Sequence, residues 1–469
     1  MSLTSTTYLI FLLICVCAFY LLPKKAKELS LFAFSVAFYC YAMPEQLLIM
    51  MVYLWIIYFT GLILHKAARF RKGILLFGLL LSVGFLFFYK YLNFTLSLVG
   101  RQEKMLSLIV PIGISYITFQ CIAYVVEIYK RKLIPVDSPV TFFTYMLLFM
   151  KVTAGPIEPP KRFFESTYKK SSFKWRNMWN ALILISTGFV KKMVVADSLA
   201  PGVAMVFEAP GEQDGWSVLL AVFMYTLQIY FDFSGYTDIA RGSAWLFGID
   251  LTENFKHPYL AKSVREFWRK WHISLSDWLK EYVYFSLGGS RVGTMRRYLN
   301  VILVFLVSGL WHGASVTFVI WGLLHGLYQV LEMLTEPILV KARSVLRIKE
   351  QGVIHSFFAR IRTFVMVMFA WIFFRASSLE NAFLVVHRLF TGWKRDMALW
   401  AAVLPEKELL ILMLVAVVFL WLAEFWSKKT KNTAGKTLII GVTSIWLVLL
   451  ALILTAGTDA VNSFIYFDF

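Results

Sequence analysis

The hydrophobic positions of this chain form long, nearly uninterrupted runs that short polar or basic segments separate. The earlier runs occupy residues 8–22, 29–41, 47–64, 74–88 and 106–126. The later ones occupy residues 179–190, 216–230, 364–374, 409–422 and 437–454. Because a bilayer-spanning helix needs roughly 20 mainly apolar residues, the pattern predicts an all-α membrane protein with roughly ten to twelve transmembrane or re-entrant helices.

Three further segments depart from simple spans. Residues 141–150 are apolar but too short to cross, and both neighbouring loops are basic, so we expect a re-entrant or in-plane helix there. Residues 299–333 are too long for one ordinary span, and we expect a break at residues 309–313. Residues 265–284 are amphipathic, and the spacing predicts one helix with an apolar stripe and a charged stripe.

Composition supports a polytopic membrane protein, because 59% of the 469 residues are hydrophobic and only 16% are charged. The net charge of +19 comes from basic clusters between the apolar runs, which is the positive-inside pattern and argues against a nucleic-acid partner. The first lysines follow the first run, so we expect a retained helix with its N-terminus outside. We interpret residues 1–469 as a single domain whose core motif region is 231–326.

Histidines and carboxylates inside apolar sequence are costly, so they are candidates for function. His312, between Gly309 and Gly313, is the first candidate, since a neutral imidazole with a pKa near ~6.5 can take a proton from a hydroxyl. His272 is a second inward-facing candidate. The competing interpretations are an interhelical hydrogen bond for His312 and a place in an aromatic belt for His272.

A second group of residues is a candidate lining of a substrate channel. On one continuous helix His325 would lie ~20 Å beyond His312, so we interpret it as a packing or interface residue that could also line the channel. Asp232 could line a cavity, pair with a basic residue or cap a helix. The remaining candidates are Trp268, Trp271 and Trp311. We recognise no metal-ligand spacing and no motif for a bound cofactor.

Several sequence strings are similar to those of one family. They are FDFSGYTD at 231–238, ENF at 253–255, EFWRKWHISLS at 266–276, LGG at 287–289, GLWHGA at 309–314 and WGLLHG at 321–326. Outside this region stand PIGISY at 111–116, AGPI at 154–157, Lys191-Lys192, and the terminal FIYF at 464–467. Together they resemble the membrane-bound O-acyltransferase family, in its bacterial alginate O-acetylase and peptidoglycan O-acetyltransferase branch. Glu158 departs from the more basic segment expected after AGPI.

The resemblance implies a ring of helices around a thinned centre with a funnel or tunnel. It also implies an enzyme that moves an acyl group, usually acetyl, to a hydroxyl of an extracytoplasmic polysaccharide such as alginate or peptidoglycan. His312 matches the family's catalytic histidine and His272 its second important position. Acetyl-coenzyme A is the expected donor substrate, with no bound cofactor. The expected partners are the lipid bilayer of the bacterial cytoplasmic membrane, an extracytoplasmic acetyltransferase protein and the polysaccharide acceptor.

Other functions remain open at this point. The D-alanyl transferase of teichoic acids shares the Trp-His and Trp-His-Gly patterns. A proton-coupled transporter could use His312, Asp232 and Asp238 as a relay, although no internal repeat is visible. A non-catalytic scaffold for a polysaccharide assembly would need none of these side chains for chemistry.

Overall fold

The structure is a computed structural model that describes residues 2–165, 174–345, 352–393, 396–429, 434–454 and 464–465. All regular elements within these ranges are helices, so the predicted all-α class is confirmed. Lys169 and Lys170 of a basic segment, and Tyr466 and Phe467 of the terminal motif, lie outside the described residues.

Several helices are long and apolar enough to cross a membrane. By length and composition the described residues contain five, which are Pro44–Lys66, Arg71–Leu98, Gly215–Leu246, Val316–Lys341 and Val353–Arg375. Three shorter apolar helices are Thr6–Leu21, Ile114–Tyr129 and Ile439–Leu449. The chain is therefore a multi-pass membrane protein, and the larger predicted number of membrane elements stays a prediction.

Contacts divide the chain into two compact units. Unit 1 comprises Met1–Gly188, Tyr236–Thr252 and Lys431–Gly441, and unit 2 comprises Phe189–Gly235, Glu253–Thr430 and Val442–Phe469. The long helix α11 (Gly215–Leu246) and the helix α20 (Ala434–Leu454) each belong partly to both. The motif region 231–326 likewise contributes to both units, and whether the whole chain acts as one domain stays a prediction.

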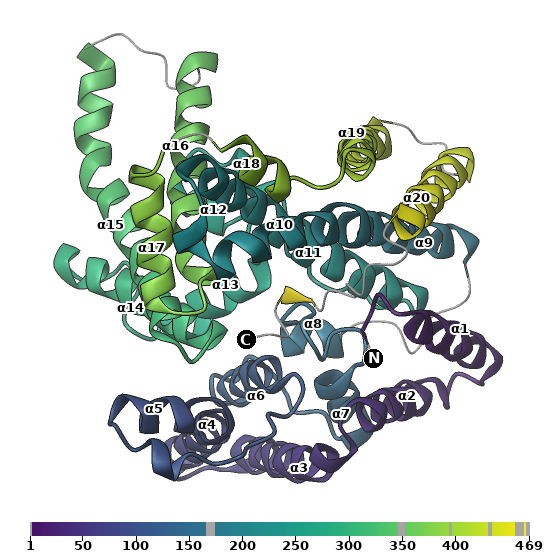
Figure 1. The fold of residues 1–469 in the computed structure, drawn as a ribbon. Helices are drawn as coiled ribbons and strands as arrows, with labels where there is room; N and C mark the ends of the chain where they lie inside the picture. The colour runs from purple at the N-terminus through teal and green to yellow at the C-terminus, as the bar shows by residue number, and fades with distance from the viewer. Residues whose placement is uncertain are drawn as a thin grey trace. The chain divides into compact units, whose positions relative to one another are not determined.

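Unit 1 is built mainly from the N-terminal helices. They are α1 (Thr6–Leu21), α2 (Lys27–Ala42), α3 (Pro44–Lys66), α4 (Arg71–Leu86), the π-turn η1 (Phe87–Tyr91), α5 (Leu92–Leu98), η2 (Gln102–Lys104), α6 (Ile114–Tyr129), α7 (Pro139–Leu147), α8 (Pro160–Phe164) and α9 (Trp175–Phe189). Helices α3, α4 and α6 lie side by side (Figure 1). Helix α7 begins at the cap Ser138, whose hydroxyl accepts a hydrogen bond from the Thr141 amide. Its nine residues confirm the predicted short helix, and its re-entrant path stays a prediction.

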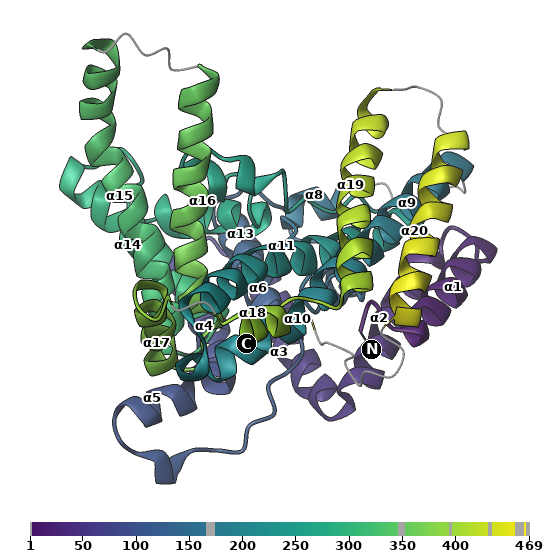
Figure 2. The same cartoon turned by 45° about the horizontal axis from the view of Figure 1, so that its top comes forward.

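Unit 2 carries the remaining elements. They are the π-helical η4 (Val190–Ala196), α10 (Asp197–Glu208), η5 (Pro210–Glu212), the first part of α11, η6 (Pro258–Leu260), α12 (Val264–Trp268), α13 (Ile273–Leu279), η7 (Lys280–Tyr284), α14 (Thr294–His312), α15 (Val316–Val345), α16 (Val353–Arg375), α17 (Leu379–Phe390), α18 (Met397–Val403), α19 (Lys407–Lys429) and the second part of α20. Figure 2 shows α14, α15 and α16 as neighbours.

The α14–α15 hairpin confirms the predicted break in the long apolar run. Helix α14 ends at His312 with Gly313 as its cap, and α15 begins at Val316. The two helices approach backbone to backbone. A Cβ at Gly309 would stand 2.2 Å from the Phe318 carbonyl oxygen, which only glycine permits. The hairpin thus presents His312 at a helix end.

The single amphipathic helix predicted over residues 265–284 is wrong. The segment consists of α12, a tight turn, α13 and the π-turn η7, and His272 at the turn has φ 44° and ψ 55°, which is left-handed. The reason is a distant segment: the Asn254 backbone oxygen accepts from the Ile273 amide and its Oδ1 from the Ser274 amide, each at 3.1 Å. These bonds satisfy amides at the start of α13 that have no partner within the helix.

Candidate functional site

His312 lies in an aromatic enclosure at the last residue of α14. Its imidazole is buried, and its ring centroid lies 5.0 Å from that of Trp321, 5.2 Å from that of Phe374 and 4.9 Å from that of Trp311. These three side chains come from α14, α15 and α16. The hairpin and its neighbour therefore surround this histidine with apolar rings that limit the access of water.

His272 lies beside His312, as the sequence hypothesis requires. The two imidazole centroids are 6.3 Å apart, and His272 also packs edge-on against Phe233 at 4.7 Å. Since hydrogen bonds extend about 2.6–3.2 Å, this spacing is compatible with one small reacting group shared by both rings. His272 sits in the turn between α12 and α13, where burial lowers its pKa to about 3. It is therefore neutral at physiological pH and can act through hydrogen bonds without carrying charge.

His325 lies behind the aromatic wall of the site. Its ring centroid is 5.0 Å from that of Trp321, so a single indole separates it from His312. The turn at Gly313 folds α15 back, which explains why His325 is not ~20 Å further along as on a continuous helix. The Trp268 indole N–H donates to His325 Nδ1 at 3.2 Å, so the neutral ring carries its proton on Nε2. His325 is thus held by Trp268.

The other two predicted tryptophans have different surroundings. Trp311 contacts both His272, at 5.9 Å between centroids, and His312, so it forms part of the enclosure. Trp271 packs at 5.0 Å against both Phe255 and Trp371. It belongs to the aromatic core that supports the His272 turn.

Asp232 belongs to a buried ion-pair network. Lys192 of η4 places its Nζ 2.6 Å from Asp232 Oδ1 and 2.7 Å from Asp197 Oδ1. The other Asp232 oxygen accepts from the Ile465 amide at 3.1 Å. Of the roles left open by the sequence, the structure shows pairing with a basic residue. Asp238 belongs to unit 1, where Arg241 is its ion-pair neighbour at 4.0 Å.

Sequence reasoning missed the residues that pack around and position the two histidines. Phe233 and Asn254 stand inside the motif strings, and Trp321 opens WGLLHG, so the strings held a signal for them. Phe374 is one phenylalanine among many in an apolar run, and nothing in the sequence distinguishes it. No group of three metal-ligating side chains occurs within the described ranges.

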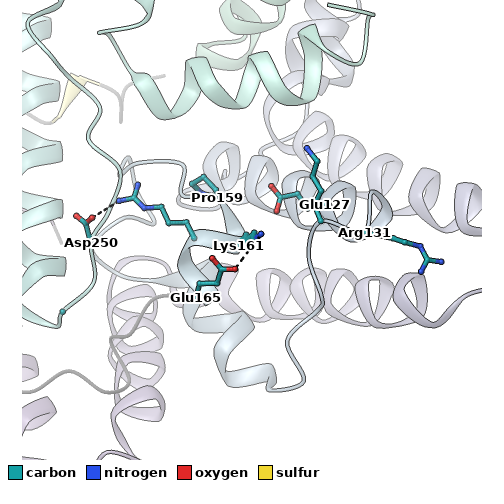
Figure 3. Close-up of a pocket in the computed structure, with 9 residues that line it drawn as sticks. Glu127, Arg131, Pro159, Lys161, Glu165 and Asp250 are labelled. Atoms are coloured by element: carbon teal, nitrogen blue, oxygen red, sulfur yellow. Dashed lines mark hydrogen bonds and ion pairs between the residues drawn. The ribbon is translucent and has the colours of Figure 1, made fainter.

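Each unit also contains a cavity. The unit 1 cavity, of about 860 Å³, is shown in Figure 3. Two of its cations contact carboxylates of the same cavity, Arg162 with Asp250 at 2.9 Å and Lys161 with Glu165 at 3.9 Å. The unit 2 cavity has a volume of about 490 Å³ and is lined in part by Trp268, the residue whose indole donates to His325.

Comparison with known proteins adds an independent observation. The model of the membrane-bound O-acyltransferase family matches residues 3–379, which include the three histidines. A probable alginate O-acetylase of Pseudomonas aeruginosa is 31% identical over 438 residues, which cover 89% of this chain and 81% of the relative. A peptidoglycan O-acetyltransferase of Helicobacter pylori is 35% identical over 361 residues, covering 70% and 67%. A teichoic acid D-alanyltransferase of Bacillus subtilis is 29% identical over 233 residues, covering 47% and 58%.

Proposed function

Because the chain belongs to the membrane-bound O-acyltransferase family and is a membrane acyltransferase, we propose that His272 and His312 catalyse the transfer of an acetyl group for the O-acetylation of an extracytoplasmic polysaccharide. The observation that carries the proposal is the 6.3 Å spacing of the His272 and His312 rings inside a buried aromatic enclosure. The relatives named as alginate O-acetylase and peptidoglycan O-acetyltransferase support a glycan acceptor.

His312 acts as the general base in this mechanism. Its neutral imidazole takes the proton of the acceptor hydroxyl while the hydroxyl oxygen attacks the thioester carbonyl. The carbon–sulfur bond then breaks, and the leaving thiolate takes up the proton. His312 is the last residue of α14, where the helix dipole favours the transient imidazolium by about 0.3–1 kcal/mol, and by up to about 2 kcal/mol in partly buried geometries.

His272 positions the acyl carbonyl. As a neutral ring it donates one hydrogen bond, and the left-handed turn fixes its direction. The rings of Trp311, Trp321 and Phe374 exclude water that would otherwise hydrolyse the thioester. The donor in this proposal is acetyl-coenzyme A on the cytoplasmic side. An extracytoplasmic acetyltransferase receives the acetyl group and modifies the polymer outside the bacterial cytoplasmic membrane.

The test uses cells in which the native copy is replaced by wild type, His312→Ala or His272→Ala at matched membrane abundance. We expect His312→Ala to lower polymer O-acetylation about 10²–10⁴-fold, the usual contribution of a general base. His387→Ala is the matched control, because His387 is an exposed histidine of the same unit. Normal ester levels in His312→Ala cells would remove the proposed base.

The acyl group itself separates the two related enzyme classes. The relative named as a D-alanyltransferase matches only 47% of this chain, so acetyl is the favoured group. Alkaline release from the polymer followed by chromatography identifies acetate or D-alanine. Release of D-alanine would replace the acetyl proposal and leave the roles of the histidines intact.

A further inference from the structure

The lining of the unit 2 cavity combines two kinds of side chain. Helices α12, α13, α14 and α15 and the π-turn η7 line it. Part of the lining is apolar and includes Val301, Val304 and Phe305 of α14. The lining also carries four cations, Arg265, Arg269, Lys280 and Arg297, against a single carboxylate, Asp277. The cavity therefore suits a ligand that is both anionic and apolar.

The four cations form no ion pair with any carboxylate among the residues that the structure describes. Asp277 interacts electrostatically with Lys280, and Glu332 interacts electrostatically with Arg265. In neither case do the charged atoms come close enough to form an ion pair. The Arg297 guanidinium contacts the Met333 sulfur at 3.2 Å. In the unit 1 cavity, by contrast, Arg162 and Lys161 already contact carboxylates (Figure 3). The positive charge of the unit 2 cavity is thus available to an outside anion.

The apolar part of the cavity continues onto a surface that suits hydrocarbon. Helix α14 exposes the large apolar side chains Met295, Leu299, Leu303 and Val307. We infer that this exposed apolar row meets the hydrocarbon of the bilayer, because apolar side chains gain by leaving water. Val301 and Val304 lie on the same helix and line the cavity. An acyl chain can therefore pass from the bilayer along α14 into the cavity.

We propose that this cavity binds an anionic phospholipid. Arg265, Arg269, Lys280 and Arg297 hold its phosphate, since guanidinium groups match phosphate oxygens in pairs. One acyl chain lies against the apolar part of the cavity. Basic pockets between membrane helices are known to suit anionic headgroups. The site is independent of the proposed reaction. Its occupant would nevertheless contact Trp268, which donates a hydrogen bond to His325.

The test measures lipid retention by the full chain in nanodiscs that contain phosphatidylglycerol and phosphatidylcholine. Native mass spectrometry counts the phospholipids that stay bound after release from the disc. We expect the wild type to retain phosphatidylglycerol, and Arg297→Gln and Arg269→Gln each to weaken retention about fivefold, from roughly 1 kcal/mol per basic residue near anionic lipid. Arg296→Gln is the matched control, because Arg296 is an exposed neighbour on α14 that does not line the cavity.

Two results would overturn the proposal. Equal loss of phosphatidylglycerol from Arg296→Gln and Arg297→Gln would mean a general surface attraction. Displacement of phosphatidylglycerol by added coenzyme A, with weaker coenzyme A binding in Arg297→Gln, would assign the cavity to the phosphates of a soluble donor. Retention that falls only in the cavity variants, and that coenzyme A leaves unchanged, supports the lipid site.

Discussion

Replacing Lys192 with methionine tests the buried ion network at its centre. The Lys192 side chain is 4% exposed and the Asp232 side chain 1% exposed, and Nζ contacts Asp232 and Asp197 at 2.6 and 2.7 Å. Methionine keeps the apolar length but removes the charge, so Asp232 loses its cation in a buried place. Breaking a buried pair in this way costs about 3–5 kcal/mol, because the remaining charge is uncompensated.

A double variant separates the loss of the attraction between Lys192 and Asp232 from the cost of leaving the Asp232 carboxylate buried without Lys192. In Lys192→Met/Asp232→Asn the buried carboxylate is replaced by an amide, whose oxygen can still accept from the Ile465 amide. Asp197 is 24% exposed and can be hydrated. Removing both members of a buried pair is often close to neutral, so we expect the double variant to recover most of the stability lost in Lys192→Met.

The assay is thermal unfolding in detergent, followed as the fraction of protein that stays monodisperse after heating. The matched control is Lys256→Met, because Lys256 pairs with Glu253 at 3.7 Å with side chains 60% and 44% exposed. A surface pair of this kind contributes about 0–1 kcal/mol. A Lys192→Met protein as stable as Lys256→Met, or a double variant no more stable than the single, would refute the reasoning.

Two further predictions concern the α14–α15 contact and His272. Gly309→Ala should lower the free energy of unfolding by about 1–3 kcal/mol, because the new Cβ would meet the Phe318 carbonyl. Gly73→Ala is the control and should not lower it, because open space surrounds Gly73. Equal melting temperatures of the two variants would contradict this prediction. The His272 pKa falls from about 6.5 in the unfolded chain to about 3 when buried, so the unfolded state binds more protons between these values. The contribution of His272 to stability should therefore fall below pH 6.5, by at most about 1.4 kcal/mol per pH unit, and His272→Gln should show a flatter profile than the wild type; parallel profiles would exclude His272 as the cause.

Features that depend on local sequence were predictable. Run length and the two glycines predicted a break at residues 309–313, because a helix of residues 299–333 would be too long for one span, and the structure has α14 end at His312. The cost of polar groups in apolar sequence singled out His312 and His272, and the family resemblance supplied the roles that we propose for them. The structure brings these two side chains together.

Features that depend on distant partners were not predictable from periodicity. The apolar stripe around His272 fits one amphipathic helix, but Asn254 binds the amides of the next two residues and breaks it. Asp232 left three roles open until Lys192, far away along the chain, showed its pairing. The place of His325 depended on the turn that folds α15 back along α14. The one wrong helix, the open role of Asp232 and the place of His325 each depended on a contact between segments that local spacing does not encode.

The positions of His272, His312 and His325 relative to their helices indicate which of them take part in the reaction and which only support the site. In an apolar interior a helix satisfies its own backbone groups, so a side chain in mid-helix meets neighbouring helices, as His325 meets Trp268. A helix end leaves carbonyls or amides that carry partial charge. His312 is the last residue of α14, so it stands where backbone carbonyls can stabilise positive charge that forms during a reaction. That position, together with the 6.3 Å spacing of the His272 and His312 rings, argues for a reactive pair more strongly than burial alone, which His325 shares.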